Sequence, residues 1–450
     1  MTQLQVLPSV CPLDCPDTCA LDITIEDNRM IRLGGSEHPI TQGFACVKMA
    51  KYPLRQHHAD RLQFPQKRVG AKGEGKFVQV GWDEALDEIA ERIASNISVH
   101  GEQSLLPFSY AGTMGLVEGE FPTAFFRALG ASELDWTICA ATAGAGWEAN
   151  YGPNKMSTPP ESVVHSKLII LWGINAFRSN NHLMPFLKEA RAGGAHILHI
   201  DPYRNETSRF ADEHWQVNVG TDAALALAIG REILHQNLQD DAYLDQFAMG
   251  IDEYRQGCEP WTLEKASQLC GVDADKIRDL ARAIGNEPAT YIKIGYGMTR
   301  NEGGGNAARA ITLLPALTGA WKHLGGGGAL STSGAFELNA SRYSGAHLLK
   351  PGRRHINQNH FGRALTNAAG DMDPPISTLF VYNSNPAAIA PDTNSVLAGL
   401  RRSDLFTVVL EHFQTDTADY ADFLFPATTF FEHTDLYKSY WQYYLQLAEP

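Results

Sequence analysis

The sequence lacks several features that would place it in other classes of protein. No apolar run approaches the roughly 20 residues that a membrane-spanning helix needs. Acidic residues outnumber basic ones, 51 to 37, and the net charge of −14 disfavours nucleic acid or an anionic membrane surface as the main partner. The G-x-G-x-x-G fingerprint of a standard NAD site is missing, and so are internal repeats and low-complexity tracts.

The N-terminal segment also lacks a recognisable targeting signal. Its first residues, MTQLQVLPSVCPLDC, contain no basic region, no apolar segment and no twin arginine, so we expect no export signal. We therefore expect a cytoplasmic enzyme. In that reducing compartment the seven cysteines should be thiols or metal ligands rather than disulfides.

The length and the hydrophobic pattern predict an α/β protein. A chain of 450 residues exceeds one ordinary domain, and about three are expected. Alternation around Asp27-Asn28 predicts a β-hairpin over 20–35. Further on, short apolar runs alternate with helical stretches, which implies parallel sheets. Strands are predicted at 167–173, 196–202, 291–297, 378–383 and 405–410, and helices at 183–191, 223–234, 274–284, 307–321 (with a kink or break at Pro315) and 394–402.

Four cysteines near the N-terminus have the spacing of a metal site. Cys11, Cys15 and Cys19 are separated by three residues each, and Cys46 follows later. Four such thiolates can hold an iron–sulfur cluster or a structural zinc. Zinc sites generally use paired C-x-x-C motifs, whereas a compact trio with one distant ligand is typical of a [4Fe–4S] cluster. Unrelated buried cysteines are the least favoured interpretation.

A lysine and a helix start add to this pattern. Lys48 follows Cys46 by two residues; it suits a surface position or a phosphate contact, and a cation beside a cluster would raise its reduction potential. With Trp82-Asp83-Glu84-Ala85 and the motifs below, the chain resembles the dimethyl-sulfoxide-reductase family along essentially its whole length. The resemblance implies a bis(molybdopterin guanine dinucleotide) cofactor with molybdenum or tungsten. It also implies that Lys48 is a catalytic residue on the electron path between cluster and pterin.

The resemblance further implies a domain plan. A small [4Fe–4S] domain at 1–57 is expected to be joined by 420–450. Two interleaved Rossmann-like parallel-sheet domains should follow, one built from 58–135 with 330–419 and the other from 136–329, which would bind one guanine dinucleotide. Family members usually continue into a further C-terminal domain, so we expect this chain to be a fragment or a natural truncation.

Cys139 is the candidate ligand of the catalytic metal. The small residues of Ala140–Gly146 suggest a tight turn into a helix, whose dipole favours a thiolate. Thiolate is a soft ligand suited to a transition metal. From the residues alone, a small buried core cysteine is the better interpretation. The resemblance changes this preference, because the segment from Cys139 to Trp172-Gly173 matches the family segment that begins at the metal ligand.

Neighbouring positions argue against formate as the substrate. The resemblance implies that formate dehydrogenases carry a histidine after the ligand, where this chain has Ala140, and an arginine in the segment corresponding to Gly325–Asn339, which has none here. Thr142, Trp136 and Trp147 are hypothetical pocket residues within hydrogen-bonding reach of the metal.

Three loops after predicted strands are candidates for nucleotide binding, since open α/β sheets bind ligands at the carboxyl ends of their strands. Glycine lets backbone approach a phosphate, while amide and carboxylate groups can recognise ribose and guanine. Ordinary strand-end turns use the same residue types, but the order of the loops resembles the family's guanine-dinucleotide site. The candidates are Trp172, Gly173 and Asn175, then Asp201, Pro202 and Arg204, then Gly220, Thr221 and Asp222.

A second dinucleotide cradle is suggested by later segments. Its candidates are Gly295, Gly297 and Met298, the Arg300–Asn306 loop, and Asn383 with Asn385. Residues 415–426 and Glu432 also resemble family segments. Cys258 and Cys270 have no partners at ligand spacing and are interpreted as structural.

The expected function is two-electron chemistry on a small-molecule substrate at the metal, with electrons passing through the cluster to an electron-transfer protein or subunit. Two alternatives remain open. One is a non-redox hydratase or transhydroxylase of the same family. The other is a cluster-only electron-transfer subunit of a larger complex, which the presence of Cys139 and the dinucleotide loops disfavours.

Overall fold

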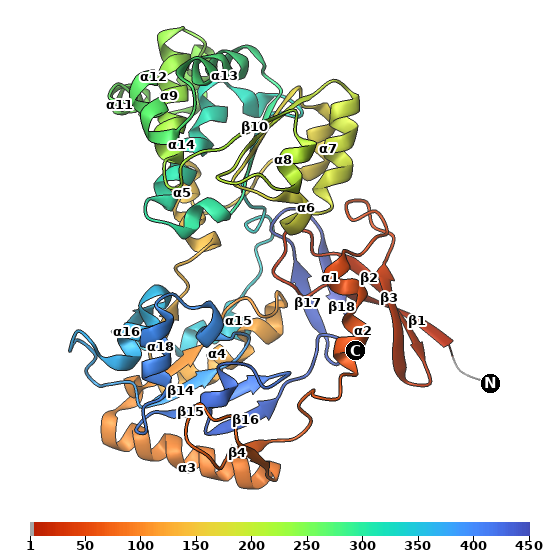
Figure 1. Ribbon diagram of the computed structural model, residues 1–450, viewed down its shortest axis with the longest axis vertical. Helices are drawn as coiled ribbons and strands as arrows, with labels where there is room; N and C mark the ends of the chain where they lie inside the picture. Colours follow the sequence, from red (N-terminus) through yellow and green to blue (C-terminus); the bar gives the residue numbers. More distant parts are fainter. Residues whose placement is uncertain (1–3) are drawn as a thin grey trace.

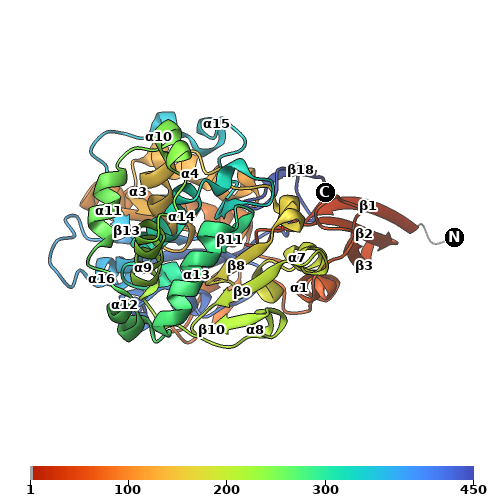
Figure 2. The same ribbon diagram turned by 90° about the horizontal axis from the view of Figure 1, so that it is seen from above.

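The computed structural model describes residues 4–450, and Figure 1 shows them as two α/β lobes stacked end to end with a smaller unit at their side. The smaller unit carries the N-terminal strands and the last two strands of the chain. Seen from above, its antiparallel sheet projects away from the lobes (Figure 2). We call it the cysteine unit, because all four clustered cysteines belong to it.

The cysteine unit is built on the predicted hairpin. Asp27 and Asn28 both have positive φ, 47° and 60°, which is the backbone that a two-residue hairpin turn requires. The hairpin prediction is confirmed. A short pair near the C-terminus packs its last strand against the first strand of the unit. The elements are β1 (Leu4–Val10), β2 (Ala20–Glu26), β3 (Arg29–Gly35), α1 (Val47–Ala50), α2 (Tyr52–Gln56), β17 (Asp435–Lys438) and β18 (Leu445–Ala448).

The upper lobe in Figure 1 holds a five-stranded sheet that is parallel throughout. Helices cover both faces, so strands such as LIILW and TYIKI are buried at every residue. In spatial order the strands are β10 (Glu213–Trp215), β9 (His196–Ile200), β8 (Leu168–Trp172), β11 (Thr290–Ile294) and β12 (Gly327–Ala329).

One face of this sheet carries most of the helices, and the opposite face is covered by α7 and the C-terminal segment around Trp441. Pro315 does not break its helix, which continues to Leu317. The helices are α5 (Ala140–Tyr151), α6 (Ala176–Ser179), α7 (Leu183–Ala192), α8 (Glu206–Phe210), α9 (Asp222–His235), α10 (Asp241–Phe247), α11 (Ile251–Cys258), α12 (Leu263–Cys270), α13 (Ala274–Asn286) and α14 (Gly304–Leu317).

The lower lobe holds a six-stranded mixed sheet. Its spatial order is β5 (Phe77–Gln79), β4 (Gln66–Arg68), β16 (Phe423–Pro426), β15 (Phe406–Glu411), β14 (Thr378–Val381) and β6 (Leu105–Phe108). The four strands from β16 to β6 are parallel, and β4 joins antiparallel. Around it lie α3 (Trp82–His100), α4 (Leu116–Leu129), α15 (Ser341–Ser344), α16 (Phe361–Thr366), α17 (Pro386–Ile389), α18 (Thr393–Leu400) and the small pair β7 (Glu133–Asp135) and β13 (His355–Asn357).

The α/β fold class is confirmed by these parallel sheets. One predicted boundary differs: 420–450 was assigned to the cysteine unit, yet β16 pairs with β15 and β4 in the lower lobe. The apolar β16 supplies buried Phe423 and Leu424 to that lobe's cores, which explains its place. The other domain limits stay predictions. Among the described residues, no helix is both long and apolar enough to cross a membrane.

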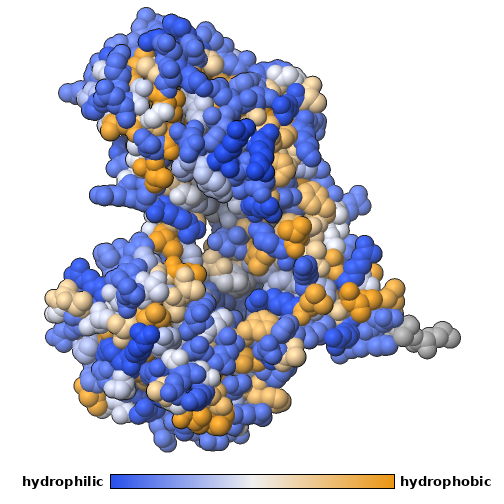
Figure 3. Space-filling view, viewed as in Figure 1, coloured by the Kyte–Doolittle hydropathy of each residue, from blue (hydrophilic) through white to orange (hydrophobic). Residues whose placement is uncertain are grey.

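The chain crosses between the two lobes in two extended segments, one between β7 and α5 and one between β12 and α15 (Figure 1). Cys139 lies at the end of the first crossing, immediately before α5. The space-filling view shows the surface hollowed between the lobes (Figure 3).

Candidate functional site

The four clustered cysteines lie together in the cysteine unit. Cys11 and Cys19 are buried and Cys15 and Cys46 half-buried, and all four are free thiols. The Cys11 amide donates to the Cys19 carbonyl at 2.9 Å, which closes the loop that carries Cys15. Burial raises the pKa of Cys11 to about 12 and also raises the pKa values of Cys15 and Cys19, and the charge of Asp17 adds to each rise. Four such thiols become thiolates together only when a cation compensates them.

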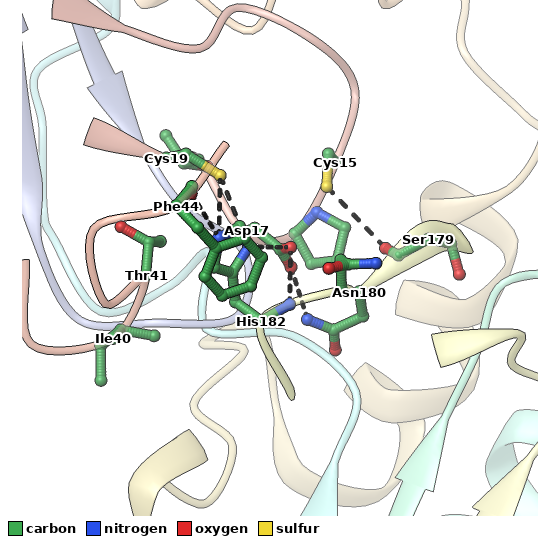
Figure 4. A network of polar contacts seen from close by, with 12 residues as sticks. Cys15, Asp17, Cys19, Ile40, Thr41, Phe44, Ser179, Asn180 and His182 are labelled. Carbon is green, nitrogen blue, oxygen red and sulfur yellow. Dashed lines mark hydrogen bonds and ion pairs between the residues drawn. The ribbon is translucent and has the colours of Figure 1, made fainter. Parts of the chain in front are cut away.

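A buried polar network joins this unit to the upper lobe (Figure 4). The Asp17 carboxylate accepts from Asn180 Nδ2 at 2.5 Å, from the His182 amide at 3.1 Å and from His182 Nδ1 at 2.7 Å. The same imidazole lies 3.6 Å from Cys19 Sγ and stacks on the Phe44 ring with centroids 3.9 Å apart. The network fixes the cysteine loop against the helical segment that follows β8.

Lys48 makes a second link between the cysteine unit and the upper lobe. It lies in α1, whose N-terminal cap is Cys46. Its ammonium donates to the Arg178 carbonyl at 3.1 Å, in the short helix α6 that follows Asn175. Its charge lowers the pKa of Cys11 and of Cys15, although burial outweighs it. The lysine therefore bridges the cysteines and a predicted dinucleotide loop.

Cys139 has a strained backbone at the start of α5. Its φ of 59° and ψ of −112° lie in a region that non-glycine residues rarely adopt. Thr299 Oγ1 donates to its carbonyl at 3.0 Å, and Arg300 Nη2 donates to its Sγ at 3.4 Å. Burial raises the pKa of this thiol, and the Arg300 charge opposes the rise. Strain of this kind is typical of functional positions.

Cys139 borders a cavity of about 340 Å³ at the carboxyl ends of the upper-lobe strands. The cavity brings Cys139 together with predicted residues from three strand-end loops and adds groups from the cysteine unit. Asp14, which lies between two of the clustered cysteines, accepts a hydrogen bond from Tyr440 Oη at 3.1 Å and faces this cavity. The predicted residues that line it are Cys139, Gly173, Asn175, Asp201, Gly295 and Gly297.

The remaining predicted loop residues support this edge of the sheet. Trp172 is fully buried and donates from Nε1 to Asp222 Oδ1 at 2.8 Å, so it orients that carboxylate. Met298 packs beneath Gly173, and Thr221 Oγ1 donates to the Asn218 carbonyl at 2.7 Å. Pro202, Arg204 and Gly220 are exposed.

Asn383 and Asn385 lie elsewhere, in a cavity of about 290 Å³ between the lower lobe and the cysteine unit. Asn383 has a positive φ of 51°. Asn385 Oδ1 accepts from Thr417 Oγ1 at 2.6 Å, and the residue occupies the N-cap position of α17 without a side-chain capping bond. The sequence analysis predicted that this segment and Gly295–Met298 form one dinucleotide site. In the structure, Gly295 and Gly297 lie beside Gly173 instead, because β11 and β8 are neighbouring strands.

Two of the hypothetical pocket residues near Cys139 are not among the residues that line its cavity. Trp147 is buried in the upper-lobe core against Trp321. Thr142 turns its hydroxyl to the Thr137 carbonyl at 2.7 Å. Trp147 follows Cys139 by eight residues, about two helical turns, which carries its ring away from the cavity and into the core. Trp136 is exposed beside Tyr110.

Several residues of the cavity were missed as individual functional groups. Arg300 stood in a loop whose single residues had no predicted role, yet it contacts Cys139. Asp14 could have been noticed from its place between Cys11 and Cys15. Nothing in the sequence pointed to Lys293, which stands in an apolar strand, or to Tyr440.

The residues present fit a large anionic cofactor and a cluster. The four thiols suit iron. At the edge between β8 and β11, a Cβ on Gly295 would lie 2.2 Å from the Gly173 carbonyl, so only glycine allows the two loops to meet. In the wall of the second cavity, the Ser384 hydroxyl is buried without a hydrogen-bond partner among residues 4–450, as expected where a ligand supplies the partner.

Fold and site together define a two-lobed α/β protein with a four-cysteine unit beside its main cavity. Comparison with known proteins shows to which family such a protein belongs. Residues 61–440 match the family model of the molybdopterin oxidoreductases, and residues 4–53 match that of the molybdopterin oxidoreductase Fe4S4 domain. The chain belongs to the molybdopterin oxidoreductase family and carries its Fe4S4 domain.

Relatives and a solved structure agree with this assignment. The probable oxidoreductase YoaE of Bacillus subtilis is 41% identical over 99% of this chain, and dimethyl sulfoxide reductase DmsA of Escherichia coli is 29% identical over 96%. The chain spans 65% and 59% of these relatives' own lengths. The acetylene hydratase of Pelobacter acetylenicus has the same fold, with a TM-score of 0.82 and 21% identity, covering 97% of this chain and 64% of that one.

Proposed function

We propose that this chain forms the main part of a molybdenum or tungsten oxidoreductase with a bis(molybdopterin guanine dinucleotide) cofactor. It would pass electrons between a small substrate and a [4Fe–4S] cluster held by Cys11, Cys15, Cys19 and Cys46. The observation that carries the proposal is the placement of strained Cys139 on a cavity that Asp14 of the cysteine unit also lines. This placement puts a candidate metal ligand next to a candidate cluster.

Four residues of the cavity then have a role. The bound metal supplies the two-electron chemistry. Cys139 would hold it, and the Arg300 guanidinium, which already donates to Cys139 Sγ, would stabilise the thiolate and leave other N–H groups for substrate. Tyr440 fixes the Asp14 carboxyl in the cavity by its hydrogen bond.

Lys48 would connect the two centres. Its ammonium is anchored on the Arg178 carbonyl between the cysteine unit and the Asn175 loop, and a cation there would favour the reduced cluster. Asp201 and Asp222 would recognise one dinucleotide from the upper lobe, and the Asn383–Asn385 segment the other. An electron-accepting protein and a cytoplasmic location stay predictions.

A second candidate is non-redox hydration at the same metal. The fold match to the acetylene hydratase of Pelobacter acetylenicus favours it. The cluster-only subunit is disfavoured, because it would need neither the Cys139 cavity nor the dinucleotide loops.

Anaerobic expression followed by metal and pterin analysis tests the proposal. We expect about four iron atoms per chain, stoichiometric molybdenum or tungsten, and GMP on acid hydrolysis. Iron without either metal would contradict it and support the cluster-only subunit. Turnover without any electron acceptor would replace it with the hydratase.

A further inference from the structure

Lys293 is a buried cation in the middle of an apolar strand. It lies in β11, paired with Leu171 of β8 on one side and Ala329 of β12 on the other. Its neighbours on the same face of the sheet, Tyr291 and Ala329, belong to a hydrophobic core. Only 3% of Lys293 is exposed, and burial lowers its pKa to about 8. An ammonium in such a place is costly unless something compensates its charge.

The described residues give the Lys293 ammonium only a compensation without direct contact. Among residues 4–450, no acceptor lies within hydrogen-bonding distance of the Lys293 ammonium and no carboxylate within ion-pair distance. The acid whose charge acts on it is Asp17. Both Asp17 oxygens are already engaged, one by Asn180 and the other by His182.

The lysine belongs instead to the wall of the cavity beside Cys139. It is one of the residues that line this cavity, together with Gly173 and Gly295 from the strand-end loops and Asp14 and Pro16 from the cysteine unit. A cavity with a buried, unpaired cation in its wall is suited to a negatively charged ligand. The glycines let backbone come close to that ligand.

We propose that Lys293 selects for negative charge in this cavity: its ammonium binds an anionic group of the ligand held between the strand-end loops and Cys139. The inference deepens the proposed function and rests on it, since the ligand there would be a pterin dinucleotide. Lys293 is a binding and positioning residue in this account. Its cost to the empty protein is offset when the anion is bound.

The first test measures how fast the dinucleotide leaves the protein. Wild type, Lys293→Met, Lys293→Arg and Lys188→Met are expressed anaerobically as the full chain, and GMP retained per chain is followed after dilution. Lys188, an exposed lysine of α7, is the matched control. Loss of one buried charge-assisted hydrogen bond should speed release about tenfold in Lys293→Met. Lys293→Arg should be intermediate, and Lys188→Met should match wild type.

The outcomes separate the two proposals. Wild type that carries iron but no GMP overturns the dinucleotide site, and the role of Lys293 with it. Wild type that carries GMP and a Lys293→Met variant that releases it equally slowly overturn only the inference about Lys293. Should Lys293→Met fail to fold, as judged by lost iron, Lys293→Gln takes its place, and release at the wild-type rate again overturns the inference.

A second readout excludes a merely structural lysine. In full-length chain from cells unable to make the pterin, the cavity holds no dinucleotide. Removing a buried charge that has no direct partner should then raise the Tm of Lys293→Met by roughly 1–3 °C. If Lys293 served the fold, for example through Asp17, the Tm would fall, and that result contradicts the proposal.

Discussion

The cysteine unit and the Cys139 cavity place their thiols in opposite kinds of surroundings. In the cysteine unit four thiols lie near enough to act on one another electrostatically, and the Asp17–His182 network contacts one of them, Cys19. At Cys139 a single thiol stands on strained backbone, with an arginine beside it and an open cavity in front. A metal held by four protein ligands is closed to chemistry, whereas a metal held by one keeps positions for other ligands. The first arrangement suits electron transfer and the second suits a reaction.

The largest expected effect is a loss of iron from the cysteine unit that leaves the upper lobe around the Cys139 cavity folded. Cys15→Ala removes one of four cluster ligands, so we expect iron to fall from about four atoms per chain to nearly none. The β8–β9–β11 core should remain folded, because it does not depend on the cluster. Iron analysis with the cluster EPR signal checks this. The structural Cys258→Ala is the control, and a full cubane signal in Cys15→Ala would remove the cluster from this account.

A second change should damage only the cavity. Gly295→Ala places a methyl group 2.2 Å from the Gly173 carbonyl, forcing the ends of β8 and β11 apart at a cost of about 2–3 kcal/mol. Retained GMP should fall while iron per chain stays constant. Gly34→Ala, whose added methyl would meet nothing within 4 Å, is the control in the cysteine unit. Equal amounts of retained GMP in both variants would show that the loops after β8 and β11 do not bind the dinucleotide.

A smaller effect concerns pH. Burial lowers the pKa of His199 to about 4; its Nε2 donates to the Ile174 carbonyl at 3.0 Å, and its Nδ1 lies 2.8 Å from Ser208 Oγ. The unfolded chain therefore binds a proton near pH 6.5 that the folded lobe does not. Stability of the upper lobe is full above that pH and falls by about 3 kcal/mol as the pH drops to 4.

Hydrogen exchange of the β8 and β9 amides, corrected for intrinsic rates, measures this fall. His199→Gln should flatten the pH profile, and His196→Gln, an exposed histidine on the same strand, should leave it unchanged. A profile as steep in His199→Gln as in wild type would assign the effect to other groups.

The sequence predicted the elements better than their assembly. Local structure can be predicted from the apolar run LIILW, because a strand buried on both faces accepts only apolar residues. It can also be predicted from Asp27-Asn28, because few residue types adopt the positive φ of that turn. Spacing alone also grouped the four cysteines. Contacts between distant segments could not be predicted from local patterns. For example, β16 joins its sheet by pairing with β4, which lies more than 350 residues earlier in the chain.

The same limit explains what was missed in the cavity. Arg300 reaches Cys139 across 161 positions of sequence, and Lys293 looks like an ordinary interruption of an apolar strand until the sheet is assembled. The grouping of Gly295 with Gly173, rather than with Asn383, follows from the order of strands in the sheet. Strand order is a property of tertiary packing that periodicity does not encode.

The central claim, that Cys139 binds the catalytic metal, is tested most directly by Cys139→Ser in the anaerobically purified chain. EPR of the pentavalent molybdenum or tungsten reports the atom bound by the protein. Replacing sulfur with oxygen should shift that signal while the reduced-cluster signal stays the same. A metal signal identical to wild type would contradict the claim.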